Sequence, residues 1–79
     1  MLKIKINEDW YIALEANGKK VCCIEPIEYD WRHIRNVRLG DVKVFSVMQI
    51  TEMSYCNCDQ AYIDDKAVRK YILEQMNYD

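Results

Sequence analysis

The chain has 79 residues, of which 51% are hydrophobic and 30% are charged, and its formal net charge is −2. A chain of this length folds as one domain with a small core, so we expect a single domain over residues 1–79. The apolar content argues against disorder. The near-neutral charge, with a pI near 5.3, excludes a protein that binds nucleic acid through its overall charge.

No segment of the sequence resembles a signal peptide or a membrane span. The opening residues, MLKIKINEDW, alternate apolar and charged side chains. A signal peptide needs an apolar core of roughly 7–15 residues, and a membrane helix needs about 20. We therefore expect a cytoplasmic protein without a membrane partner, whose four cysteines are reduced.

The first part of the chain predicts three strands. In LKIKI, residues 2–6, apolar and charged residues alternate as they do in a strand with one buried face. Asn17-Gly18 is the preferred pair for a two-residue type I′ turn, because both positions need positive φ. The turn predicts a hairpin in which Ile12 lies opposite Cys23.

The middle of the chain fits either a helix or a strand. We predict a helical turn over residues 27–32, because apolar residues recur there at helical spacing. The segment HIRNVRL then runs into Gly40-Asp41, a pair typical of hairpin turns. This second hairpin would place Arg38 directly opposite Lys43, and like charges opposite each other destabilise a sheet.

The next segment, VKVFSVMQITEM at residues 42–53, is apolar on both faces. Such a pattern predicts a central strand that is covered on both sides. Together with the preceding strands it predicts an α+β fold: a small antiparallel sheet of about five strands, with curling toward a barrel as one variant. One C-terminal helix would pack on this sheet.

The C-terminal helix is predicted from IDDKAVRKYILEQMN. Asp64 is the expected N-cap, and Ile63 and Val68 have the spacing of a hydrophobic staple. Leu73 falls on the opposite, charged face. The apolar stripe of the helix consists of Ala67, Val68, Tyr71, Ile72, Gln75 and Met76.

The best candidate for a functional surface is the segment DWRHIRNVRLGD, which holds three arginines and the single histidine of the chain. Interface cores are enriched in Tyr, Trp and Arg, and all three types occur here when Tyr29, which precedes the segment, is included. The alternative is a solvated face whose arginines pair with nearby acids. The predicted partner-binding residues are Tyr29, Trp31, Arg32, Arg35, Arg38 and Lys43.

The cysteines and the histidine allow one weak metal hypothesis. Cys23, His33, Cys56 and Cys58 would make a Cys₃His site. The spacings are Cys-Cys and Cys-x-Cys, whereas zinc knuckles use Cys-x₂₋₄-Cys. We therefore expect no metal and no cofactor. With one histidine and no glycine-rich phosphate loop, we also expect no enzyme.

The sequence thus favours a non-enzymatic module that binds a larger protein. An inhibitor or adaptor of the kind that phages and mobile elements encode, such as an anti-CRISPR protein, fits the size by analogy. One alternative is a nucleic-acid-binding β-surface, and another is a domain stapled by zinc. A homodimer through an exposed edge strand also stays open.

Overall fold

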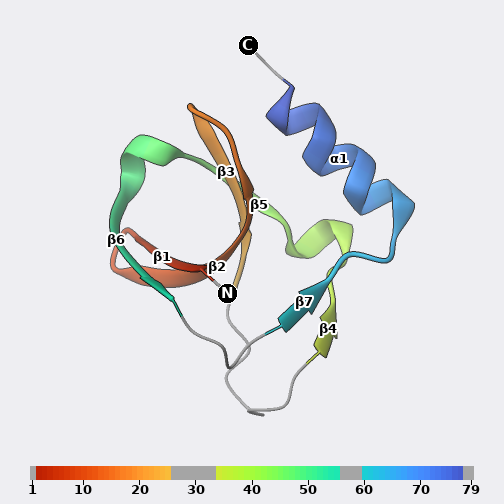
Figure 1. Cartoon of the computed structure of the whole chain (residues 1–79), viewed down its shortest axis with the longest axis horizontal. Coiled ribbons are helices and arrows are strands. Elements are labelled where there is room, and N and C mark those ends of the chain that lie inside the picture. The colour runs from red at the N-terminus through yellow and green to blue at the C-terminus, as the bar shows by residue number, and fades with distance from the viewer. Residues whose placement is uncertain (1, 26–33, 56–59, 78–79) are drawn as a thin grey trace.

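The computed structural model describes residues 2–25, 34–55 and 60–77 (Figure 1). A single α-helix, α1 (Lys66–Met76), ends this part of the chain, and two 3₁₀ turns, η1 (Leu39–Asp41) and η2 (Val47–Gln49), flank the fifth strand. The strands are β1 (Leu2–Ile6), β2 (Asp9–Ala16), β3 (Lys20–Ile24), β4 (Ile34–Asn36), β5 (Lys43–Ser46), β6 (Ile50–Tyr55) and β7 (Gln60–Tyr62).

Five of the strands form one antiparallel sheet in the order β5-β3-β2-β1-β6. The α1 helix lies beside this sheet, against β2 and β3 (Figure 1). The predicted α+β fold, a five-stranded antiparallel sheet with one C-terminal helix, is therefore confirmed. The sequence did not predict a second sheet, in which β4 and β7 pair in parallel.

The large sheet curls but does not close. Its two edges, β5 and β6, are separated along the chain only by the three residues of η2. A connection this short requires the edges to approach each other, so the strands wrap around in a ring (Figure 1). The edges are not hydrogen-bonded to each other, and the sheet remains an open, curled layer.

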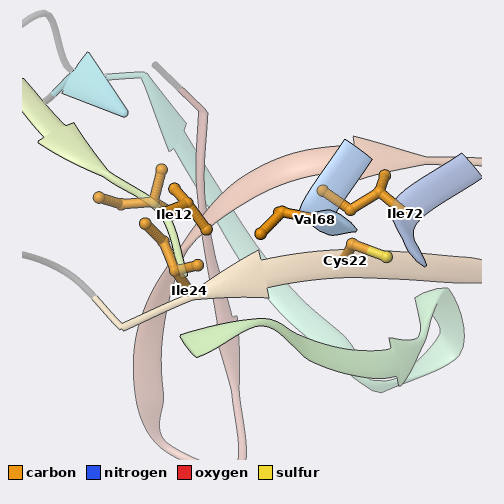
Figure 2. Packing of buried hydrophobic residues seen from close by; sticks show 6 residues of the cluster. Ile12, Cys22, Ile24, Val68 and Ile72 are labelled. Atoms are coloured by element: carbon orange, nitrogen blue, oxygen red, sulfur yellow. The ribbon is translucent and has the colours of Figure 1, made fainter. Parts of the chain in front are cut away.

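The curl creates two apolar clusters on opposite faces of one sheet. The inner cluster is built on Ile4, Ile6, Val21 and Cys23. The outer cluster fills the space between the sheet and α1 (Figure 2), and its buried members are Ile12, Cys22, Ile24, Val37, Val68 and Ile72. Because successive strand residues point to opposite faces, β3 contributes alternately to both clusters.

The strand that is covered on both sides is β3, and the prediction of residues 42–53 for this role is wrong. Four of the five residues of β3 are buried, whereas in β6 only Ile50 is even partly buried. The predicted strand is broken at η2, where the Ser46 hydroxyl accepts a hydrogen bond from the Met48 amide at 3.3 Å. The Ser46 amide in turn donates to Oε1 of Gln49 at 3.1 Å.

The β2–β3 hairpin exists, but its turn differs from the predicted type I′. Gly18 has no positive φ. Instead, the Asn17 side chain organises the loop, since its Oδ1 accepts from the amides of Lys19 and Lys20, each at 2.7 Å. The Asn17 Nδ2 group also donates to the Met76 carbonyl at 2.9 Å and so ties the loop to the end of α1.

The longer loop changes the register of this hairpin. The predicted pairing of Ile12 with Cys23 is wrong, because Ile12 lies opposite Ile24. The register also shifts between Ala13 and Glu15, which is a β-bulge. Ile12 and Ile24 therefore share the outer face beneath α1.

The type I′ geometry occurs instead between β1 and β2, at Asn7 (φ 51°) and Glu8 (φ 69°). A glutamate at positive φ is strained, whereas Asn-Gly suits this turn. We expect Glu8→Gly to raise the free energy of unfolding by about 0.5–1 kcal/mol in urea denaturation. Glu8→Ala is the control, because it removes the same carboxylate but keeps the strain. Equal stability of the two variants would contradict this account of the turn.

The C-terminal helix forms as predicted, with a shift of one residue at its start. Asp65, not Asp64, is the N-cap, and its Oδ1 accepts from the Ala67 amide at 2.8 Å. Val68 and Ile72 are buried as the apolar stripe predicts. Within the described residues, no helix has the length and apolar character needed to cross a membrane.

Candidate functional site

The described part of the predicted contact segment centres on the 3₁₀ turn η1. Backbone and carboxylate hydrogen bonds hold this turn: the Arg38 amide donates to Oδ2 of Asp41 at 3.1 Å. The Asp41 amide donates to the Arg38 carbonyl at 2.9 Å, and the Val42 amide donates to the Leu39 carbonyl at 3.3 Å. The sequence spacing of Arg38 and Asp41 permits this closed arrangement because Asp41 occupies the third position of the turn.

Residues on both sides anchor η1 to the fold. Val37 is buried in the outer cluster, and Val42 packs against the same cluster. Between them the turn projects into solvent, with Leu39 47% exposed and Arg38 exposed beside it. The Arg38 guanidinium makes no hydrogen bond or ion pair with the residues that the structure describes. The turn therefore presents an apolar side chain next to an unengaged cation.

Lys43, at the start of β5, is the second described cation of the predicted surface. It lies opposite Cys23, so the predicted juxtaposition with Arg38 is wrong. The reason is that the segment before Gly40 does not form a hairpin with β5, because β4 pairs with β7 instead. The Lys43 ammonium lies 3.8 Å from the Glu25 carboxylate, and both side chains are exposed.

A shallow polar depression adjoins these residues. It has a volume of about 120 Å³ and is lined by Glu25, Gly40, Asp41 and Lys43. Its two carboxylates and one ammonium leave it without a strong charge of either sign. We define Arg38, Leu39 and Lys43, with this depression, as the η1 surface.

For the remaining predicted contact residues, the structure describes no side chain. For Arg35 the structure gives the backbone position in β4, opposite Ala61 in β7. The predicted helical turn over residues 27–32 also falls outside the described part of the chain. Of the residues named above, Tyr29, Trp31, Arg32, His33, Cys56 and Cys58 lie outside the described residues.

Cys23 is the one described member of the metal hypothesis. Its side chain is fully buried in the inner cluster, and burial raises the pKa of the thiol to about 12. A zinc ligand must be a thiolate, which this environment disfavours. Cys22 points to the outer cluster, and burial raises the pKa of its thiol as well. Both cysteines therefore fit the role of small core residues.

No metal-binding group of three His, Cys, Asp or Glu side chains occurs within residues 2–25, 34–55 and 60–77. The sequence analysis also missed a charged cluster at the β1–β6 end of the sheet. Lys5 lies 3.1 Å from Glu52, 3.7 Å from Glu8, and 5.9 Å from the ring centre of Trp10. The hydrogen bond and charge of Glu52 raise the pKa of Lys5. The charged side chains of this cluster pair with one another, so they are less available to bind a ligand than the side chains of the η1 turn.

Sequence reasoning identified Arg38 and Lys43 but missed Leu39 as an exposed residue, because it placed Leu39 in a strand. Comparison with protein-family models, with curated proteins and with solved structures gives no match to this chain. The α+β architecture and the η1 surface are therefore the basis for a functional proposal.

Proposed function

We propose that this chain is a non-enzymatic module that binds a larger protein through the η1 surface. The main support is the exposure of Leu39 on a turn that hydrogen bonds and two anchoring valines hold in place. Because the backbone of the turn is already held, binding through Leu39 costs little backbone conformational entropy. Next to it, the Arg38 guanidinium is available for hydrogen bonds to carboxylates or carbonyls of a partner.

The charge distribution favours a protein partner over nucleic acid. Proteins that bind the phosphates of nucleic acids use clustered Lys and Arg side chains. On the η1 surface, Glu25 lies 3.8 Å from Lys43, and Asp41 adds a second carboxylate. Apolar anchors combined with arginine are typical of protein interfaces. We propose that Tyr29, Trp31, Arg32 and Arg35 also contact the partner.

The class of module is proposed by analogy. A small chain without a catalytic motif fits an inhibitor or adaptor that acts in the cytosol. Phage and mobile-element proteins, including anti-CRISPR proteins, are of this kind. Such a protein works by occupying a surface of its target, which requires affinity but no chemistry.

The proposal is tested by affinity capture from lysate of the source cell, with half of each sample treated with nuclease. The baits are the wild type, Arg38→Glu, and the control Lys19→Glu, which reverses an exposed charge at the opposite end of β3. We expect a stoichiometric protein that survives nuclease with the wild type and the control. Arg38→Glu should retain at most about a tenth of it, since a desolvated charge contact contributes more than about 1.4 kcal/mol.

Two results would contradict the proposal. Material that disappears after nuclease treatment would indicate nucleic acid as the partner. Equal capture by Arg38→Glu and the wild type would remove η1 from the interface. Circular dichroism of the three baits shows whether each is folded, so that loss of binding is not confused with unfolding.

A further inference from the structure

A second candidate binding surface is the outer edge of the strand β6. It pairs with β1 on one side, and no other strand of the described chain pairs with its outer edge. From Thr51 to Tyr55 every residue is exposed. An edge strand offers a row of backbone donors and acceptors to any further strand. The outer edge of β6 is therefore able to extend the sheet.

Two large apolar side chains stand along this edge on one face. Met53 is 65% exposed and Tyr55 is 83% exposed. Met53 lies opposite Ile4, and Tyr55 lies opposite Leu2. Directly opposite residues share a face, so both side chains continue the apolar inner face beyond its buried part. A strand added at this edge would cover them.

Beyond its first two residues, the strand lacks the usual protection against pairing. Natural edges are guarded by unpaired lysines, prolines or bulges. The sequence of β6, ITEMSY, contains no lysine and no proline, and its one charge, Glu52, is engaged by Lys5 at 3.1 Å. The register of this ladder shifts at the start of the strand: Lys5 lies opposite Glu52 but Ile6 lies opposite Ile50, so Thr51 is the extra residue of a bulge. From Glu52 onward the pairing with β1 is regular, and beyond Glu52 the strand carries no charge.

We propose that the partner at this edge is a second copy of the chain, with two β6 strands paired antiparallel about a two-fold axis at Met53. In a continuous sheet, residues that lie opposite each other must share a face. A two-fold axis normal to the sheet therefore lies midway between the two copies of one residue, which face each other. With Met53 at the axis, it faces the partner's Met53 and Thr51 faces the partner's Tyr55. In both copies, Met53 and Tyr55 lie on the apolar inner face.

The charge of Glu52 favours the register centred on Met53 over the register centred on Glu52. An axis at Glu52 would place two carboxylates directly opposite each other, which destabilises a pair of strands. With the axis at Met53, Glu52 instead faces the partner's Ser54 and keeps its own Lys5. The strand is thus more self-complementary in the register centred on Met53 than in the register centred on Glu52, and self-complementarity is the requirement for an isologous interface.

The test uses the full chain alone, measured by light scattering after size-exclusion chromatography over a range of concentrations. We expect a dimer for the wild type and at least a tenfold higher dissociation constant for Met53→Lys, which puts two like charges at the axis. Met48→Lys is the matched control, because Met48 is 90% exposed but lies in η2, outside the strand. It should dimerise like the wild type.

A mixing experiment tests the register. Met53→Lys and Met53→Glu should each be monomeric but should form a heterodimer when combined, since opposite charges then meet at the axis. A wild type that stays monomeric at all concentrations, or a mixture that does not associate, would overturn the proposal. Circular dichroism confirms that the variants are folded. Because no partner protein is involved, the outcome is independent of the function proposed for the η1 surface.

Discussion

Truncation of Ile72 to alanine is expected to lower the free energy of unfolding by about 2–5 kcal/mol, measured by urea denaturation. Ile72 lies within the outer cluster with Val68, Ile12 and Ile24 (Figure 2). Removing its buried methyl and methylene groups leaves a cavity that the sheet and the helix cannot easily close. A small domain has a total stability near the lower end of about 5–15 kcal/mol, so this loss is a large share.

Leu73 provides the matched control for this experiment. It is the next residue of the same helix, but its side chain is 60% exposed. Leu73→Ala removes a similar side chain and should change the free energy of unfolding by less than about 0.5 kcal/mol. If the two variants lose equal stability, α1 does not pack on the sheet through the face described here.

The second large effect is a loss of stability at alkaline pH that originates from Cys23. Burial raises the pKa of this thiol from its ordinary value of 9.0 to about 12 in the folded chain. Between these two values the unfolded chain releases the proton while the folded chain keeps it. Deprotonation therefore favours unfolding, and the stability contribution that is fully present below pH 9.0 is lost as pH rises toward about 12.

The expected slope is close to 1.4 kcal/mol per pH unit from this one thiol. It is measured as the free energy of unfolding at several pH values from about 7 to 11, for the wild type and Cys23→Ala. The variant leaves a small cavity and should start out less stable, but its stability should fall less steeply above pH 9.0. Parallel curves for the two proteins would mean that Cys23 does not titrate with a raised pKa.

Local sequence patterns predicted the elements whose structure depends on near neighbours. The alternation in residues 2–6 gave β1, and the apolar stripe through Val68 and Ile72 gave α1 and its buried face. The hairpin between β2 and β3 was also correctly located. In each case the residues that decide the structure lie within one hairpin or a few helical turns.

The sequence predictions were wrong where contacts between distant residues, or competing side-chain contacts, determine the local structure. β4 pairs with β7 across more than 20 residues, and no local pattern specifies a parallel partner. The Asn17 side chain bonds to its own loop and to Met76, which replaces the type I′ turn that the Asn-Gly pair favours. At η2, Ser46 and Gln49 cap a turn inside an apolar run that otherwise has the pattern of one strand.

The same distinction applies to the candidate site. The unusual content of DWRHIRNVRLGD located Arg38 and Lys43, but their relative positions depended on a hairpin that does not form. The exposure of Leu39 follows from the hydrogen bond between the Arg38 amide and Asp41, which closes η1. A side-chain-capped turn next to an apolar residue is a pattern that sequence analysis could have used.

The most direct test of the proposed function is the affinity of the purified chain for its captured protein, measured by isothermal titration calorimetry. Three variants are compared with the wild type: Arg38→Glu, Leu39→Asp and the control Lys19→Glu. We predict that Arg38→Glu and Leu39→Asp each weaken binding at least tenfold, equivalent to about 1.4 kcal/mol, while Lys19→Glu binds like the wild type. Equal affinities for all four proteins would show that η1 is not the binding surface.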